Sequence, residues 1–242
     1  MTDAAPRRTL ALAPLTVTCL SDKCQRAKLI LETAHASASA LLKAYELARA
    51  QRGRPRGMTT DNEQDLLRSM LVMTAAGLDA IAKQLITDAL PSLLDVDDKA
   101  QNSFEKFLAR RLGSDSSSSV LVGARLLAAA LATRAPQARL IQEYVGQLVG
   151  GSLQSTDSLF EVAAALGVDP ASIHLDPARL RPIFETRNRI IHELDINLNS
   201  PRRTRNVRSQ QEMIRGCEHL FRLASALVAS VDKRLSRART SA

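Results

Sequence analysis

Hydrophobic residues recur along most of this chain at three- and four-residue steps, the spacing of amphipathic helices. Leu and Ala supply most of these apolar positions, and both are strong helix formers. Runs of β-branched residues are nearly absent, and no stretch alternates in the way a half-buried strand does. The pattern therefore predicts an all-α fold, an up-and-down helical bundle.

Capping residues indicate where several of these helices begin. Ser21 is expected to cap the first helix, Thr60 and Glu63 have the spacing of a capping box, and Asp176 precedes a proline at the first helical position, Pro177. Breaks rich in Gly and Pro separate the helices. The expected helices span residues 21–49, 60–90, 97–112, 120–134, 137–149, 156–166, 177–195 and 210–235.

The chain of 242 residues is long enough to bury one substantial core. We expect a single all-helical domain over residues 21–242, preceded by an arm over residues 1–20 that is flexible or only loosely docked. The arm carries two arginines and an apolar run, but Pro14 interrupts the run and no small-x-small cleavage site follows, so a secretory signal is not expected. No stretch reaches the ~18 uninterrupted apolar residues of a membrane span. The sequence therefore predicts a protein that does not enter the membrane.

The net charge of +8 comes from 33 Lys and Arg against 25 Asp and Glu, and most of the basic residues are arginines. Guanidinium groups bind phosphate bidentately, so nucleic acid is a natural partner, although a basic surface can also serve solubility alone. The aromatic share of 3% argues against a single-strand binder that stacks bases on rings. Three cysteines without a metal-ligand spacing predict no metal site and a cytoplasmic location.

The helix expected over residues 177–195 carries charge where a core helix is apolar. Arg187 falls on its apolar stripe, and an unpaired buried guanidinium costs several kcal/mol. A second, polar stripe runs beside the first and holds Glu185, Asn188, His192 and Asp195. A surface helix with one snorkelling arginine is the simpler interpretation. The two stripes together favour the edge of a cleft. The apolar stripe consists of Leu180, Ile183, Phe184, Ile191 and Leu194.

Two segments resemble a known family. The run from Arg187 and Asn188 to His192 resembles the RNxxxH motif of HEPN-domain ribonucleases, and an acidic residue follows the histidine as in that family. The segment LLRSMLVMTAAGLDAIAKQLI resembles the early helix of the RiboL-PSP-HEPN-like group. The resemblance covers these two helices and does not extend over the N-terminal arm or residues 102–169.

This resemblance implies an all-α bundle of the HEPN type with additional helices. It also implies a metal-independent endoribonuclease without a cofactor. RNA is then cut by attack of the 2′-hydroxyl on the adjacent phosphate, which leaves a 2′,3′-cyclic phosphate. Proteins of this family act as homodimers with a composite active site, and many are toxins or antiphage-defence effectors with an antitoxin or defence-system partner.

The residue types suit this reaction. Histidine gains and loses a proton near neutral pH, so His192 can move protons. Arg187 keeps its charge and can stabilise the phosphorane-like transition state, and Asn188 can orient the imidazole or the phosphate. Arg189 lies closer to His192 on the helical wheel than Arg187, which is about 140° away. The working arginine is therefore Arg187 by the motif and Arg189 by geometry, and a second chain in a dimer removes the conflict.

Further residues are expected to support this site. Asp79 sits on a mostly apolar helix and is predicted to form an ion pair with Arg187, unless it faces water. Glu185, Arg189 and Asp195 accompany the motif on its own helix. His35 and His219 are expected at the surface. The loop after the motif helix is expected to bind the RNA backbone through Arg202, Arg203, Arg205 and Arg208.

Two alternatives use the same residues differently. The chain can be a non-catalytic helical module that binds RNA or another protein. It can also be a DNA-binding regulator, which the basic charge permits but for which no helix-turn-helix stands out.

Overall fold

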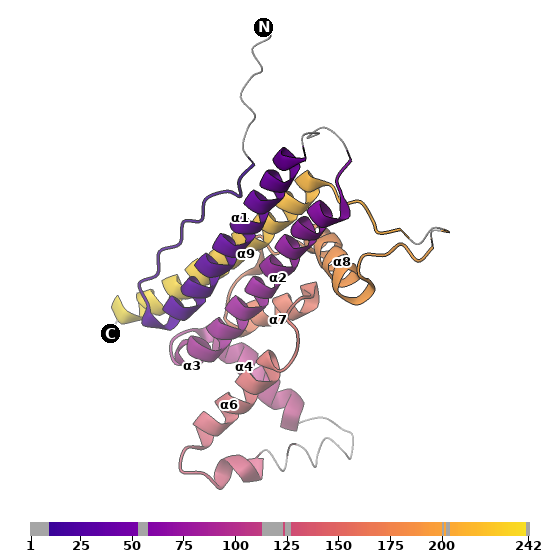
Figure 1. Cartoon of the computed structure of the whole chain (residues 1–242). Coiled ribbons are helices and arrows are strands. Elements are labelled where there is room, and N and C mark those ends of the chain that lie inside the picture. Colours follow the sequence, from indigo (N-terminus) through magenta and orange to yellow (C-terminus); the bar gives the residue numbers. More distant parts are fainter. Residues whose placement is uncertain are drawn as a thin grey trace.

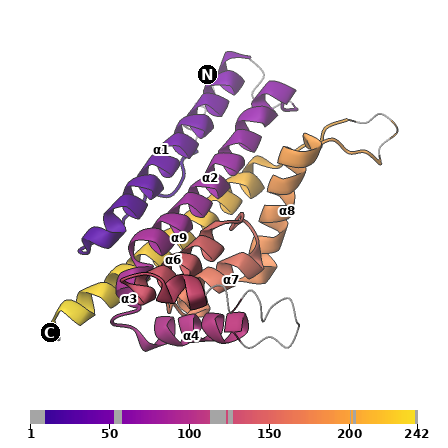
Figure 2. The same cartoon turned by 90° about the horizontal axis from the view of Figure 1, so that it is seen from below.

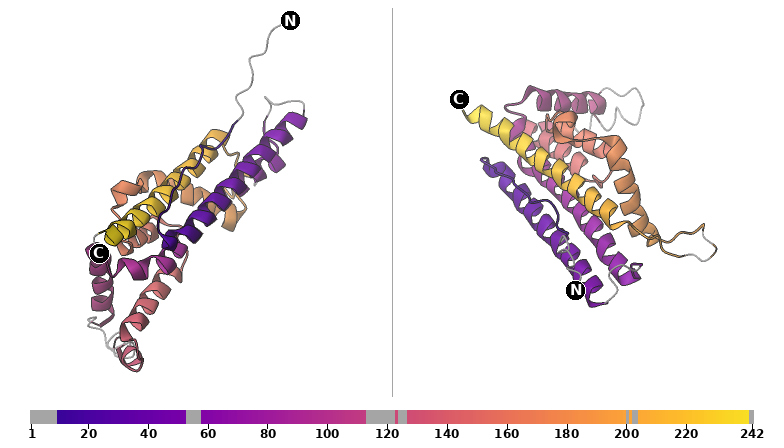
Figure 3. Two further views of the ribbon diagram at one scale, coloured as in Figure 1. Left: turned by 90° about the vertical axis from the view of Figure 1, so that its left-hand side faces the viewer. Right: turned by 90° about the horizontal axis from the view of Figure 1, so that it is seen from above.

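The computed structural model describes residues 10–52, 58–112, 123, 127–199, 201 and 204–240. Three long helices, α1 (Asp22–Gln51), α2 (Asp61–Asp88) and α9 (Gln210–Thr240), lie side by side (Figure 1, Figure 3). Within the described ranges the only β-structure is an isolated antiparallel bridge between Ile196 and Arg205. The prediction of an all-α fold is confirmed.

The first two helices begin where their capping residues predict. The hydroxyl of Ser21 accepts a hydrogen bond from the backbone N–H of Lys23 at 3.3 Å. The N–H of Thr60 donates to the carboxylate of Glu63 at 2.9 Å, and the N–H of Glu63 donates to the Thr60 hydroxyl at 3.3 Å. This reciprocal pair satisfies two of the donors that an α-helix leaves free at its start.

Four shorter helices lie at one end of the long ones (Figure 1, Figure 2). The second helix was predicted to end near residue 90, and α2 ends at Asp88, before Pro91. Pro91 then lies in the first turn of a further helix, where its missing N–H costs no hydrogen bond. Of the helix expected over 120–134, residues 120–122 and 124–126 lie outside the described residues, and residues 127–131 are helical. The four are α3 (Leu90–Leu93), α4 (Asp98–Leu112), α6 (Pro136–Val149) and α7 (Thr156–Ala165).

The motif helix follows these elements. A short 3-10 helix, η1 (Pro170–Ile173), leads to α8 (Pro177–Glu193). The carboxylate of Asp176 caps α8 by accepting the N–H of Ala178 at 2.9 Å, as predicted. α8 lies beside α2, and the chain then returns through a projecting loop to α9 (Figure 2). Buried side chains of α8 and all the other named helices belong to one continuous hydrophobic core.

The N-terminal segment is docked rather than flexible over its described part. Leu12 is only 6% exposed. The backbone N–H groups of Leu20 and Ser21 donate to the carboxylate of Asp232 on α9 at 3.0 and 2.7 Å. The N–H of Ala13 donates to Glu218, also on α9. Residues 10–20 thus correspond to the docked alternative for the arm, because α9 offers carboxylates to their backbone. Residues 1–9 lie outside the described residues.

α2 is long and apolar enough to cross a membrane by length and composition alone. In the fold, 56% of its most apolar 18-residue window is buried inside the protein. It packs against both α1 and α9 (Figure 3). A core helix meets the same criterion, so this is weak evidence for a membrane span.

The close approach of α1 and α2 depends on a glycine. A Cβ added at Gly77 of α2 would lie 2.6 Å from the Cβ of Ala34 on α1. We expect Gly77→Ala to lower the free energy of unfolding by about 1–3 kcal/mol, because the two helix backbones must separate. Gly146, inside α6, has no neighbouring atom within 4 Å of an added Cβ. The control Gly146→Ala should raise the free energy of unfolding by about 0.5–1 kcal/mol. Urea unfolding followed by circular dichroism measures both. A change in the free energy of unfolding with the same sign in both variants would contradict the close packing of α1 and α2.

Candidate functional site

The two halves of α8 have different environments. In the first half, Leu180 and Phe184 are buried and Ile183 packs near Gly216 of α9. In the second half, the predicted core residues Ile191 and Leu194 are 39% and 64% exposed. The apolar stripe was therefore predicted correctly for the first half and wrongly for the second, because no other described element covers the end of this helix.

Arg187 lies where these two halves meet, and it is partly buried. Its Nη1 donates to the side-chain oxygen of Asn188 at 2.9 Å. Its Nε is buried and has no hydrogen-bond partner. Burial lowers the pKa of Arg187 from its ordinary value, and the negative charge of Asp79 opposes this change. The guanidinium is thus held at one edge and has unused donor capacity at another.

The other motif residues face outward. His192 is exposed, as are Arg189 and Glu185. The structure joins Arg187 to Asn188 but forms no hydrogen bond between His192 and either of them among the described residues. Within one chain, therefore, nothing selects Arg187 or Arg189 as the partner of the imidazole.

Asp79 does not form the predicted ion pair with Arg187. Its carboxylate pairs with Lys83, four residues along α2, at 2.9 Å. It also accepts the backbone N–H of Leu153 at 2.7 Å. The prediction fails because these two groups lie closer, and Asp79 acts on Arg187 only through its charge. Asp79 thus ties the segment before α7 to α2.

Asp195 does not continue the polar stripe of α8. The helix ends at Glu193, and Leu194 and Asp195 both adopt left-handed backbone conformations, with φ of 49° and 59°. Each such non-glycine residue costs of order 1 kcal/mol or more. The turn directs Asp195 inward, where its side chain is completely buried. The prediction that Asp195 shares a face with His192 is therefore wrong.

Basic and amide groups surround the Asp195 carboxylate. Arg68 of α2 donates through Nε at 2.9 Å, and Arg208 donates through both Nε, at 2.9 Å, and Nη2. The side-chain amide of Asn206 donates at 3.1 Å. Burial alone raises the pKa of Asp195, but the hydrogen bonds from Arg208, Arg68 and Asn206 outweigh it and hold that pKa below its ordinary value. The carboxylate is therefore charged in the folded protein.

The network extends to the surface through Asp65. Arg68 also donates to Asp65 at 2.9 Å, and Arg205 pairs with Asp65 at 2.6 Å. These ion pairs, with Asp195, use both described arginines of the loop that was predicted to bind RNA, Arg205 and Arg208. Their guanidinium groups already have carboxylate partners, which leaves Arg208 in particular little capacity for phosphate. The other two residues of that prediction, Arg202 and Arg203, lie outside the described residues.

Sequence reasoning missed Arg68 and Asp65. The available signal was an arginine beside Leu67 on an apolar helix, because such a residue requires a carboxylate partner. His219 was also misjudged: it is buried rather than at the surface, and its Nε2 has no partner. Burial, followed by the charges of Arg222 and Arg179, lowers the pKa of His219, so the ring is favoured as neutral.

The described part of the chain contains no group of three His, Cys, Asp or Glu side chains placed to hold a metal ion. Comparison with known proteins adds no family: no family model, no curated protein and no solved structure matches this chain.

Replacing the buried carboxylate tests the network. Asp195→Asn removes the counter-charge of Arg208 and leaves Arg68 with Asp65 as its remaining carboxylate, so we expect the free energy of unfolding to fall by about 3–5 kcal/mol. Asp95→Asn, at an exposed position, is the matched control and should change it little. Urea unfolding at pH 7 measures both, and a loss below about 1 kcal/mol for Asp195→Asn would refute the assignment.

The stability difference between the wild-type protein and Asp195→Asn should depend on pH. The pKa of Asp195 is lower in the folded chain than the ~3.9 of an unfolded aspartate. Its stabilising contribution is thus complete above that unfolded value and is lost as the pH falls through the folded pKa. Between pH 5 and pH 2 the wild-type protein should therefore lose more stability than Asp195→Asn, by urea unfolding at each pH.

Proposed function

We propose that this protein is a metal-independent endoribonuclease of the HEPN type, with Arg187, Asn188 and His192 acting on RNA. The observation that carries the proposal is the state of Arg187. Its guanidinium is partly buried, is steadied by Asn188, has an unpartnered Nε, and lies on the same helix as an exposed imidazole. The resemblance extends the proposal to a cytoplasmic toxin or antiphage-defence effector that is controlled by a partner.

The proposed chemistry uses these groups in separate roles. The RNA 2′-oxygen attacks the neighbouring phosphorus, and the bond from phosphorus to the 5′-oxygen breaks. His192 accepts the proton of the 2′-hydroxyl and returns a proton to the departing 5′-oxygen. Arg187 stabilises the negative charge on the non-bridging oxygens. The products are a 2′,3′-cyclic phosphate and a 5′-hydroxyl end.

In this proposal a second copy of the chain supplies the arginine that acts beside His192. Contiguous exposed apolar surface in a soluble protein marks an interaction site. A two-fold dimer that buried such a surface would bring the two motif helices together. Arg187 of one copy could then approach His192 of the other. Ile191 and Leu194, which flank His192 in the sequence, are exposed, and so are Leu198 and Val207 in the segment between α8 and α9.

A non-catalytic RNA-binding or protein-interaction module is the second candidate. Its supporting observation is that no hydrogen bond from a described residue orients the imidazole of His192. This candidate predicts RNA binding without cleavage, unchanged by His192→Ala.

Cleavage in a chelator separates the two candidates. Purified protein incubated with single-stranded RNA in EDTA should produce cyclic phosphate ends. His192→Ala should lower the rate at least about 100-fold, because proton transfer is lost. Arg187→Ala should lower it by about 100- to 1000-fold, because transition-state charge is no longer stabilised. Product ends are identified by mass spectrometry.

Two variants on exposed residues control this experiment. Arg181→Ala removes another arginine of α8, and His174→Asn removes another histidine while keeping a residue that tolerates the left-handed backbone at that position. Both should cut RNA at the wild-type rate. Wild-type protein that binds RNA without cutting it would favour the second candidate.

Mixing two inactive variants tests the composite site. If Arg187 and His192 come from different copies, mixed dimers of Arg187→Ala and His192→Ala contain one intact site. Random assortment should then restore about a quarter of wild-type activity, because half of the dimers are mixed. RNA cleavage after co-refolding measures this. Confirmed dimers without any recovery would place both residues of a site in one chain.

A further inference from the structure

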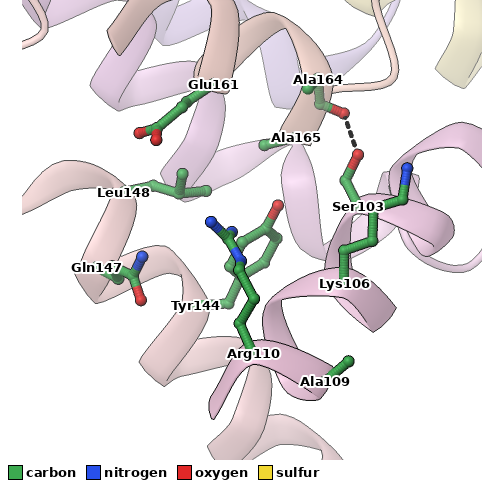
Figure 4. Close-up of a pocket in the computed structure, with 10 residues that line it drawn as sticks. All are labelled: Ser103, Lys106, Ala109, Arg110, Tyr144, Gln147, Leu148, Glu161, Ala164 and Ala165. Carbon is green, nitrogen blue, oxygen red and sulfur yellow. Dashed lines mark hydrogen bonds between the residues drawn. The ribbon is translucent and has the colours of Figure 1, made fainter. Parts of the chain in front are cut away.

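A cavity lies away from the motif helix, among α4, α6 and α7. It has a volume of about 530 Å³, within the range of small-molecule sites. Figure 4 shows its lining side chains, with Arg110 and Tyr144 near its centre and Glu161 on the opposite wall. Apolar side chains form much of the remaining wall, including Leu148 and Ala165.

Two solvent-exposed cations of α4 line the cavity. Arg110 and Lys106, four residues apart on α4, line it and form no ion pair or hydrogen bond with another described residue. The neighbouring Arg111 differs, because it donates to Gln147 at 3.0 Å and lies over the ring of Phe107. Of the two arginines of α4, Arg110 is therefore the one that lines the cavity without a partner among the described residues.

The floor of the cavity is preformed. The ring of Tyr144 packs against Phe107 and Phe104, with centroids 4.8 and 5.4 Å apart, which holds it in place. Tyr144 is only 4% exposed, yet its hydroxyl makes no hydrogen bond with another described residue. Burial raises the pKa of Tyr144 to about 12, so the hydroxyl stays protonated and can donate. The ring is thus buried while the hydroxyl lines the cavity, where it is free to donate to a bound ligand.

We propose that this cavity binds a small organic anion, a phosphate ester or carboxylate with an apolar body. The anionic group meets Arg110, Lys106 and the Tyr144 hydroxyl, and the apolar body lies against Leu148 and the alanines. Glu161 then opposes the ligand and limits affinity for multiply charged anions. This site is independent of the proposed ribonuclease activity.

Titration calorimetry of the full-length chain tests the site with four probes. They are 1-naphthyl phosphate, 1-naphthoate, uncharged 1-naphthol and inorganic phosphate. The two naphthyl anions should bind at least about tenfold more tightly than either 1-naphthol or phosphate alone, because both the charge and the apolar body contribute. The stronger of the two anions identifies phosphate esters or carboxylates as the preferred source.

Three variants are expected to change the affinity for the naphthyl anions in different directions. Arg110→Gln should weaken binding of the naphthyl anions about tenfold or more. Glu161→Gln should strengthen it, because a like charge is removed. Arg139→Gln, an exposed arginine of α6 outside the cavity, should leave it unchanged. No anion binding at about 10 mM, equal effects of the two arginine variants, or weaker binding by Glu161→Gln would overturn the proposal. Thermal unfolding confirms that each variant is folded.

Discussion

The arrangement of the motif region depends on one buried carboxylate. Asp195 has no contact with solvent, and a charge in that position is tolerable only because Arg68, Arg208 and Asn206 all donate to it. These donors come from α2 and from the segment before α9. The carboxylate therefore joins the end of α8 and the segment before α9 to α2, whose Arg68 lies 127 residues earlier in the chain. It also offsets the strain of two consecutive left-handed residues at the end of α8.

The burial of Asp195 determines which side chains at the end of α8 are exposed to solvent. Because the chain turns inward at Asp195, the preceding turn of the helix, with Ile191 and His192, is left on the outside. The fully satisfied carboxylate and the partly satisfied Arg187 are thus different kinds of buried charge. The first stabilises the fold, and the second retains a donor that no described residue uses. The proposed activity rests on the second kind.

The other arginines also differ in whether the fold gives their guanidinium groups a partner. Arg205 and Arg208 looked like a phosphate-binding loop, yet carboxylates neutralise them. Arg110 drew no attention in the sequence, yet it stands unpaired in a cavity. A net charge of +8 therefore does not indicate which arginines are available for a ligand. Availability depends on the partners that the fold brings within reach.

Local patterns in the sequence determined the helices, because caps such as Ser21, the Thr60 and Glu63 pair and Asp176 act on backbone groups only a few residues away. They also determined that Arg187 would be unusual, since a cation on an apolar stripe is visible without a structure. The dimeric, ribonucleolytic function remains a prediction from the motif. Only the tertiary structure decided that Asp79 pairs with Lys83, that Ile191 and Leu194 are exposed, and that Asp195 is buried with Arg68. Those outcomes depend on which distant elements meet, and helical periodicity defines a face of a helix but not what covers it.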